Sequence, residues 1–378
     1  MTAVSASLFL AAVALAAWSY LGYPAWIRRR AVRANGRPER PAASLPAIEV
    51  LLAAADEEAV IAERVRDLLA QDYSGELRVR VGCDGCRDAT AQRAREAASA
   101  DPRVEIAELT PRRGKAAVLN RLLAGSRSEL VVFTDANTRF DRDAVLRLAV
   151  PFADPRVGAA CGRLVLETAE GGESAETLFW DRESSVKEAE GRLGVCLGAN
   201  GAIYAARRAL VEPLPAGEIL DDLWIPARIA SRGADVVFAR EAVARERAPS
   251  GIREELARRF RIGVGAGRFL RRELWIWRTR RPLLTLAFVS RKAARWLAPV
   301  LVLAAALAGL GSPTLRPLAI GILALGAVSA GAALAGLRVP GGAGRLYYFG
   351  VINLALSVGV LAGLSGYRLS AWKRESRG

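Results

Sequence analysis

Aspartates stand directly after short apolar segments in the first half of the sequence. The aspartates are Asp56, Asp84 and Asp135, and the segments are residues 48–55, 77–82 and 130–134. One aspartate at such a place is ordinary, because aspartate favours turns and helix N-caps. If the segments are parallel strands, however, their carboxyl ends lie at one edge of a sheet, where α/β folds bind their ligands. We therefore expect these carboxylates to share one rim.

Two other arrangements of oxygen-bearing side chains could take part in chemistry. Asp135 and Asn137 alternate at the end of an apolar segment, which is either a turn or a site for a hard divalent cation that also binds phosphate oxygens. Asp221 and Asp222 interrupt the apolar run 219–225. Burying such charges is costly. A partly buried aspartate there would have a raised pKa and could act as a base.

The chain contains no histidine, which excludes Ser-His-Asp and Cys-His catalysis and His-ligated zinc. Any general base is therefore an Asp, Glu, Lys, Tyr or Cys side chain. Cys83 and Cys86 form a C-x-x-C pair, but only Cys161 and Cys196 remain as possible partners. This spacing argues against zinc and favours small, partly buried cysteines in a reducing compartment.

The elements that must position these residues alternate between strand and helix. Residues 48–55 form an apolar run typical of a buried parallel strand, further strands are expected at 77–82, 104–109 and 130–134, and helical patterns occupy the intervals, at 59–70, 89–98 and 115–124. Alternating strands and helices predict a doubly wound, Rossmann-like α/β sheet. A proline-containing stretch at 37–46 is expected to be the linker that precedes it.

The composition of the 378 residues indicates a membrane protein. Apolar residues make up 52%, and 54 basic against 39 acidic residues give a net charge of +15. Residues 4–27 carry no charge and are long enough to span a bilayer. Arginines follow at once, so the positive-inside rule places the N-terminus outside and the next domain in the cytoplasm of a bacterial inner membrane. A cleaved signal peptide is disfavoured, because no basic region precedes the run.

The C-terminal third is apolar again. Residues 296–311, 315–337 and 346–367 are expected to span the membrane, and 283–290 to lie in the interface. Four spans leave the C-terminus outside, yet its basic tail favours the inside, so the C-terminal topology stays open. The expected segments are a transmembrane helix (1–27), a basic linker (28–46), a catalytic domain (47–250), interfacial helices (251–292), three transmembrane helices (293–367) and a basic tail (368–378).

From about residue 48 to 268 the order of motifs resembles the membrane-bound family 2 glycosyltransferases, which include hyaluronan, cellulose and poly-N-acetylglucosamine synthases. Each motif is weak alone, and the set in order is specific. The matching segments are A-A-D-E-E (54–58), C-D-G-C-R-D (83–88), R-G-K-A-A-V-L-N (113–120), T-D-A-N (134–137), L-G-A-N-G-A (197–202), L-D-D (220–222) and R-R-F-R (258–261).

The resemblance implies a GT-A fold and an inverting transfer from a nucleotide-diphosphate sugar, with a UDP-sugar favoured, to a lipid-linked or saccharide acceptor. It implies that Asp222 is the base and that Asp221 orients it. Position by position it also implies a donor site at Asp56, Glu57, Asp84, Lys115, Asp135, Arg258 and Arg261, a Mg²⁺ or Mn²⁺ site at Asp135 and Asn137, and an acceptor loop at Gly198, Ala199, Asn200 and Gly201.

The sequence also departs from the family pattern. Asn137 replaces the second aspartate of D-x-D, and Ile262 stands where the family has a tryptophan that holds the acceptor in processive synthases. Single or limited sugar addition is therefore as open as long-chain synthesis. These departures leave a second hypothesis, a non-catalytic glycosyltransferase-like membrane module that binds nucleotide or supports polysaccharide export.

Two charged segments have more than one interpretation. The arginine-rich stretch 253–281 is interleaved with aromatic residues, and because it precedes apolar spans it favours anionic lipid over nucleic acid. Glu183 and Lys187 stand four residues apart, which fits either an exposed ion pair or a helix beside the acceptor. Nucleotide sugar, acceptor and membrane are the expected partners, no nucleic acid is expected, and protein partners are unknown.

Overall fold

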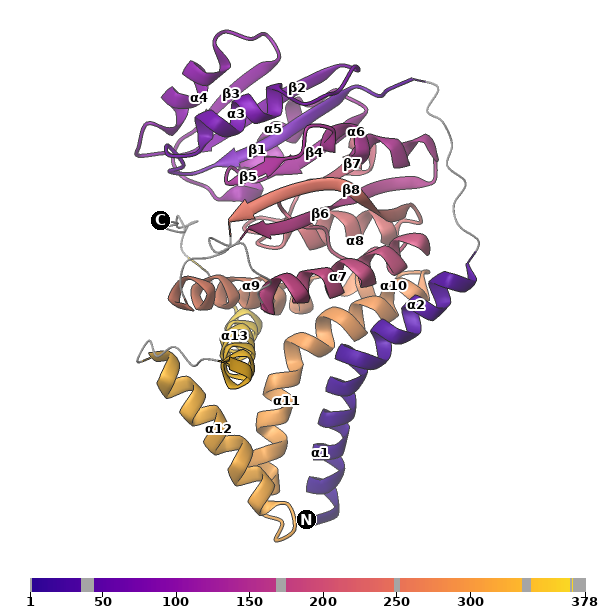
Figure 1. Ribbon diagram of the computed structural model, residues 1–378, viewed down its shortest axis with the longest axis vertical. Helices are drawn as coiled ribbons and strands as arrows, with labels where there is room; N and C mark the ends of the chain where they lie inside the picture. The colour runs from indigo at the N-terminus through magenta and orange to yellow at the C-terminus, as the bar shows by residue number, and fades with distance from the viewer. Residues whose placement is uncertain are drawn as a thin grey trace.

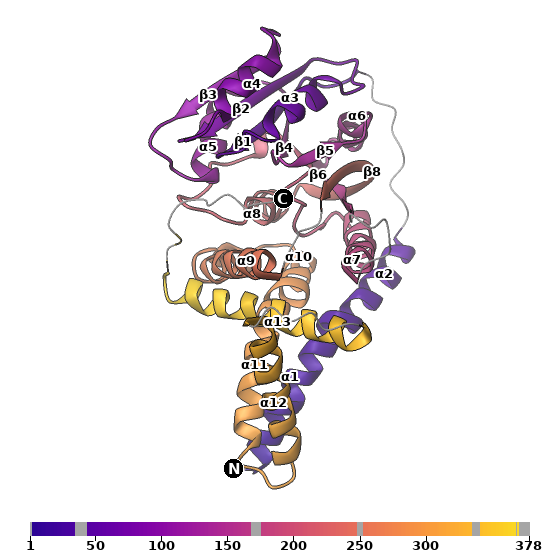
Figure 2. The ribbon, with the colours of Figure 1, turned by 60° about the vertical axis from the view of Figure 1, so that its left-hand side comes forward.

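The computed structural model describes residues 2–34, 44–167, 175–247, 252–334, 341–367 and 369. Residues 35–43 of the expected basic linker, and all of the expected basic tail except residue 369, lie outside these residues. In Figure 1 a sheet with its helices forms one end of the molecule, and a layer of helices lies beneath it. From this layer α1 (Thr2–Ala17), α11 (Ala294–Gly309) and α12 (Arg316–Leu334) extend away from the sheet in both ribbon views (Figures 1 and 2).

The first half of the sheet is parallel, as the sequence predicts. Its strands are adjacent in the order β3 (Val104–Leu109), β2 (Leu77–Asp84), β1 (Ile48–Ala54) and β4 (Leu130–Thr134). Every residue of β1 is buried, which is the pattern of a central parallel strand covered on both faces. Asp56, Asp84 and Asp135 consequently follow neighbouring strands at the same edge of the sheet.

The helices that connect these strands are α3 (Ile61–Leu69), α4 (Thr90–Ala98) and α5 (Lys115–Gly125). Their apolar side chains recur at helical spacing and face the sheet, as in α3, where Ile61, Val65 and Leu68 are buried. α5 begins at Lys115 directly after Gly114, whose φ of +92° is a conformation that favours glycine. This turn fixes where the Lys115 side chain starts.

The second half of the sheet contains both parallel and antiparallel pairs, which the doubly wound sheet expected from the sequence did not include. β7 (Tyr204–Arg207) is antiparallel to β4, β6 (Val157–Glu167) is antiparallel to β7, β8 (Asp235–Arg247) is parallel to β6, and β5 (Thr138–Phe140) is antiparallel to β8. The other elements are α6 (Ala144–Ala149), η2 (Val150–Ala153), α7 (Ala175–Arg192), η3 (Arg208–Leu210), α8 (Asp221–Ser231), α9 (Ile252–Arg272) and η4 (Leu274–Trp277).

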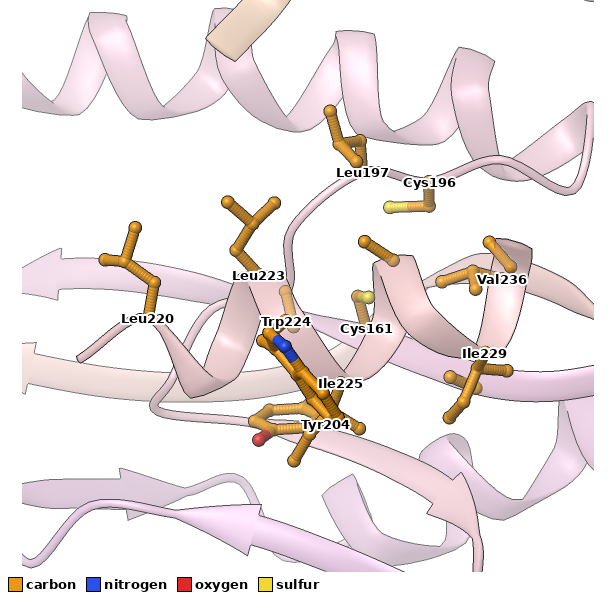
Figure 3. Packing of buried hydrophobic residues seen from close by; sticks show 14 of the residues in the cluster. Cys161, Cys196, Leu197, Tyr204, Leu220, Leu223, Trp224, Ile225, Ile229 and Val236 are labelled. Carbon is orange, nitrogen blue, oxygen red and sulfur yellow. The ribbon is translucent and has the colours of Figure 1, made fainter. Parts of the chain in front are cut away.

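The core beneath α8 is continuous with the sheet. Figure 3 shows Leu223, Trp224 and Ile225 of α8 with Tyr204 and Cys161 of the strands and with Leu197 of the loop that follows α7. These side chains are all buried. Because α8 begins at Asp221, the packing of its apolar residues fixes Asp221 and Asp222 at the end of the helix that faces the rim.

Two helices in the described residues are long and apolar enough to cross a membrane, Ala6–Arg33 and Pro282–Gly309. The first comprises α1, η1 (Trp18–Gly22) and α2 (Tyr23–Arg33), and the second α10 (Pro282–Ala287), η5 (Phe288–Ala293) and α11. A buried core helix or a signal sequence meets the same length and composition test. The boundary expected between residues 292 and 293 falls within the second continuous helix.

The last helix, α13 (Gly341–Leu364), lies alongside α9 and crosses the direction of α11 and α12 (Figure 2). Glycines permit this close approach. A Cβ at Gly263 or Gly267 of α9 would collide with the α13 backbone, and one at Gly359 or Gly363 of α13 would collide with the α9 backbone. Small residues spaced four apart are a common solution for helices that pack backbone to backbone.

Candidate active site

A half-buried lysine, Lys115, lies between the two halves of the sheet. The Nζ atom of Lys115 lies 2.9 Å from Asp135 Oδ1 and 3.2 Å from Asp221 Oδ1. Burial alone favours the neutral amine, but the carboxylates of Asp135 and Asp221 outweigh burial and raise the pKa of Lys115. Lys115 is therefore a fixed positive charge between a strand end of the parallel half and the start of α8.

Asp221 is held from a second direction by a tyrosine. The Tyr204 hydroxyl donates a hydrogen bond of 3.1 Å to Asp221 Oδ2, and the Tyr204 ring stacks on Phe133 with 4.6 Å between centroids. The sequence analysis did not identify Tyr204. A lone tyrosine at the start of a short strand carries no local signal of its role, because its partner Asp221 is on a different element.

Asp222 differs from its neighbour because its carboxylate has no hydrogen-bond or ion-pair partner within the described part of the chain. Its backbone carbonyl accepts a hydrogen bond of 2.7 Å from the N–H of Ala199. Burial and the nearby Asp221 carboxylate raise the pKa of Asp222 to about 6. The arrangement thus provides a carboxylate that is free to accept a proton near neutral pH.

The loop at residues 197–202 lies against the carboxylates of Asp135 and Asp222. A Cβ at Gly201 would be 3.4 Å from Asp135 Oδ2 and 3.9 Å from Asp222 Oδ2. The structure therefore brings together Asp135, Lys115, Asp221, Asp222 and Gly201, all of which the sequence analysis selected.

The charge balance of this cluster fits a divalent cation. Within the described residues the Lys115 ammonium lies at hydrogen-bond distance from the carboxylates of Asp135 and Asp221, and the Asp222 carboxylate lies near the same Gly201 as Asp135. Asp135 offers carboxylate oxygen, which is the donor that Mg²⁺ and Mn²⁺ prefer. Asn137 donates its amide nitrogen to Glu246 of β8 at 2.9 Å, which leaves its amide oxygen as the atom that could bind a cation.

The expected donor residues in the first two loops mostly organise the chain itself. Asp84 is fully buried, and its two carboxylate oxygens accept hydrogen bonds of 2.7 Å from the N–H groups of Arg113 and Gly114. Asp56 has φ +58° and accepts from the Arg87 N–H at 2.8 Å.

The guanidinium of Arg112 binds the other carboxylate oxygen of Asp56 at 2.6 Å. Burial opposes ionisation of Asp56, but the bonds from Arg87 and Arg112 outweigh it and lower the pKa. The N–H of Glu57 donates to Thr90 Oγ1 at 2.8 Å. The first two loops are therefore tied to each other and to the segment that leads into Lys115.

Two expected donor ligands lie on α9. Arg258 forms an ion pair of 2.8 Å with Glu255 of the same helix, and Glu255 also binds Arg259. Arg261 lies one turn further along α9. In Figure 1 this helix belongs to the layer beneath the sheet, so contact of Arg258 and Arg261 with a diphosphate stays a prediction.

The expected acceptor loop is attached to α7 by a lysine. Asn200 is buried, its Oδ1 lies 2.5 Å from Lys187 Nζ, and its Nδ2 donates to the Gly162 carbonyl at 2.9 Å. Gly198 has φ +77°. The contacts favour the interpretation of α7 as a helix beside the acceptor loop over that of an exposed surface helix.

A buried ion cluster links this loop to the apolar helices. The fully buried Arg291 of η5 lies 3.0 Å from Glu183 and ion pairs with Glu190, both on α7. Arg291 also donates to the Leu197 carbonyl at 2.7 Å. Glu190 accepts from the Tyr23 hydroxyl at 2.8 Å and from the Leu197 N–H at 3.0 Å. The cluster thus fixes the start of the acceptor loop against α2 and η5.

Comparisons with known proteins agree with this geometry. The family described as "Glycosyltransferase like family 2" matches residues 46–265. An N-acetylglucosaminyltransferase of Rhizobium meliloti (strain 1021) is 30% identical over 191 residues, which cover 49% of this chain and 44% of that protein. The N-acetylglucosaminyltransferase of Azorhizobium caulinodans is 25% identical over 232 residues, 57% of this chain and 58% of that protein. The chain thus matches about half the length of these relatives.

A solved structure, described as mannosyltransferase PcManGT from Pyrobaculum calidifontis in complex with GDP-Man and Mn²⁺, superposes with a TM-score of 0.70. It is 22% identical and the match covers 94% of this chain and 99% of that one. The superposition establishes the GT-A fold. The chain belongs to glycosyltransferase family 2.

Proposed function

We propose that this enzyme transfers a sugar with inversion from a UDP-sugar to a hydroxyl of a lipid-linked or saccharide acceptor at a membrane surface, with Asp222 as the base. The observation that carries the proposal is the unpartnered Asp222 carboxylate, which lies beside the acceptor loop and the Lys115–Asp135 pair. A displacement reaction needs a base for the acceptor hydroxyl and a positive charge for the leaving diphosphate. Asp222 supplies the base in this proposal, and Lys115 supplies the positive charge.

In this displacement the acceptor oxygen attacks the anomeric carbon while Asp222 takes the proton from that oxygen. The bond between the anomeric carbon and the phosphate oxygen breaks, and its electron pair leaves with the nucleotide diphosphate. Lys115 places its positive charge where the leaving diphosphate gains negative charge. Asp221, held by Tyr204, orients Lys115 and keeps the pKa of Asp222 raised.

Asp135, with the amide oxygen of Asn137, would hold a Mg²⁺ or Mn²⁺ ion. When bound, such an ion neutralises charge on the diphosphate as a Lewis acid. Asp56, Glu57, Asp84 and the two arginines of α9 complete the proposed donor site. In this assignment Asp84 acts through the loop at residues 112–115 as much as by direct contact.

The relatives' names favour an N-acetylglucosaminyl donor, which supports a UDP-sugar. The two long apolar helices support a membrane setting in which the sheet faces the cytoplasm, since arginines follow the first helix. The non-catalytic hypothesis is disfavoured, because Asp135, Lys115, Asp221 and Asp222 form one connected cluster.

The test is the release of nucleotide diphosphate from UDP-, GDP- and dTDP-sugars by membranes that carry the full chain, with and without Mg²⁺ or Mn²⁺. We expect metal-dependent release from one donor and a loss of about 10²–10⁴-fold in Asp222→Asn, the usual contribution of a general base. Asp101→Asn, which alters an exposed ion pair with Arg103, is the matched control. Equal turnover by wild type and Asp222→Asn would overturn the assignment of the base.

A further inference from the structure

The ammonium group of Lys292 lies beside the acceptor loop. Two basic residues close to it in the sequence form ion pairs. Arg291 binds Glu183 and Glu190, and Arg295 binds Glu183 at 2.9 Å. The Lys292 ammonium, in contrast, has no hydrogen-bond or ion-pair partner among the residues that the structure describes. It is only partly exposed. Withdrawal of a cation from water without a direct ion pair among these residues is costly, even with the carboxylates of Glu183 and Asp222 acting on it electrostatically, so its position needs a reason.

The position of Lys292 is set by a glycine of the acceptor loop. A Cβ at Gly198 would be 3.2 Å from both Cε and Nζ of Lys292 and 3.6 Å from Leu223 Cδ1. The loop thus presents bare backbone where the lysine side chain lies. Gly198 is three residues before Gly201, the residue against Asp135 and Asp222. The ammonium therefore belongs to the same loop that borders the proposed base.

A second ammonium adds to the positive charge there. Lys187 binds Asn200, which is two residues after Gly198 in the same loop. Both Lys187 and Lys292 act electrostatically on Asp222. Lys115, which is paired with Asp135 and Asp221, serves the proposed donor side. Two ammonium groups, those of Lys187 and Lys292, therefore lie at the acceptor loop in addition to the Lys115 ammonium.

We propose that Lys292 binds a phosphate group of the acceptor, so that the enzyme selects acceptors that carry a phosphate within reach of the attacking hydroxyl. The proposal rests on the proposed function and names the chemistry of its acceptor. Lys292 lies in the long apolar helix Pro282–Gly309, at the level where that helix meets the acceptor loop. The phosphate comes from a lipid-diphosphate-linked sugar or from a soluble sugar phosphate, and the two sources are separated by experiment.

The first experiment measures acceptor KM with matched pairs of acceptors. The soluble pair is N-acetylglucosamine 1-phosphate and N-acetylglucosamine, and the lipid pair is polyprenyl-diphosphate-linked N-acetylglucosamine and a neutral alkyl N-acetylglucosaminide. We expect wild type to prefer the phosphate member of one pair, and Lys292→Met to raise its KM about tenfold or more, the usual effect of losing a charge-assisted contact. Which pair shows the preference identifies the source.

The controls separate this contact from general charge effects. Lys292→Arg keeps the cation and should retain most of the preference. Arg280→Gln removes one exposed positive charge at the start of the same region and should leave acceptor KM unchanged. Lys292→Met should melt no lower than wild type, because it removes a half-buried charge that has no direct ion pair among the described residues. An equal KM for both members of each pair, or an equal rise for both in Lys292→Met, would overturn the proposal.

The second experiment does not depend on turnover. Binding of polyprenyl-diphosphate-linked N-acetylglucosamine and of N-acetylglucosamine 1-phosphate to the detergent-solubilised full chain is titrated in the presence of UDP. We expect about tenfold weaker binding of one of them in Lys292→Met than in wild type or Arg280→Gln. Unaltered binding of both in Lys292→Met contradicts the subsite. Absence of nucleotide release by wild type contradicts the proposed function instead, so the two failures are distinguishable.

Discussion

The two halves of the site treat their charges differently. On the proposed donor side, in the loops after β1 and β2, the carboxylates of Asp56 and Asp84 accept hydrogen bonds from backbone N–H groups, and Asp56 also binds Arg112. On the acceptor side, Asp222 and Lys292 have no such partners within the described residues. The donor side is organised by the chain alone, whereas the acceptor side keeps charges that a substrate can meet.

The difference has a physical origin in what supports each half. The donor loops are short connections between buried parallel strands and helices, so that their geometry follows from the sheet. The acceptor loop is supported by the ion cluster around Arg291, which joins helices from both ends of the chain. The acceptor half should therefore be more sensitive to changes far from the reacting atoms.

The largest effect is expected from Arg291→Met. This change leaves Glu190 and one contact of Glu183 without their buried counter-charge, which typically costs about 3–5 kcal/mol. The Leu197 carbonyl also loses its donor, so acceptor binding should weaken together with thermal stability. Thermal melting of the full chain in detergent, followed by acceptor titration, measures both.

The double variant Arg291→Met with Glu190→Gln sharpens this comparison. Removal of both charges should recover part of the lost stability, because fewer unpaired groups remain buried. Arg280→Gln, at an exposed position of the same region, is the control and should melt like wild type. If Arg291→Met also melts like wild type, the ion cluster does not support the acceptor loop.

A smaller effect is expected from Asp84→Asn on the donor side. An amide can accept only one of the two N–H bonds from Arg113 and Gly114, and its NH₂ group faces the other donor. We expect nucleotide affinity to fall about 10–100-fold, the equivalent of about 1–3 kcal/mol for an unsatisfied buried group. Isothermal titration with UDP checks the change, and Asp101→Asn is the control.

The melting temperature measured without nucleotide distinguishes between two roles of Asp84. If Asp84 organises the loop, Asp84→Asn should melt lower than wild type even when no nucleotide is present. If Asp84 only contacts the nucleoside, as the family resemblance implies, the loss should be confined to affinity. Unchanged affinity and melting together would remove Asp84 from the donor site.

The donor half could be read from the sequence, and the acceptor half only in part. Apolar residues precede Asp56 and Asp135, and the alternation of strand and helix patterns adds the strand before Asp84, so the three ends were visible from residues 48–134 alone. The short antiparallel strands β5 and β7 have three and four residues and leave no such run. The mixed order of the second half depends on long-range pairing that no local pattern records.

Partners across long sequence separations were also beyond the sequence analysis. Glu183 and Lys187 have the spacing of a helical pair, yet Glu183 binds Arg291 and Arg295 while Lys187 binds Asn200. Charges within the apolar region around residues 291–295 were visible in the sequence as flanking positives. Their role could not be read, because it depends on where α7 packs.

The smallest expected effect is a pair of opposite shifts in the pH profile, which tests how the acceptor half tunes Asp222. Burial and Asp221 raise the pKa of Asp222 to about 6, while Lys292, Lys115 and Lys187 lower it. The base must be ionised, so kcat/KM should fall about tenfold per pH unit below this value. Removing the anion in Asp221→Asn should move the acidic limb to lower pH, and removing the cation in Lys292→Met should move it to higher pH.

Each shift should be about one pH unit or less, because the charges removed are neighbours rather than direct partners of the carboxylate. The measurement is kcat/KM for the donor from pH 5 to 8, in roughly the range where a perturbed carboxylate titrates. Asp101→Asn should leave the limb in place. Shifts in the same direction for both variants would mean that a group other than Asp222 sets the acidic limb of the pH profile. The contrast between a hydrogen-bonded donor side and a charged acceptor side would then have no link to catalysis.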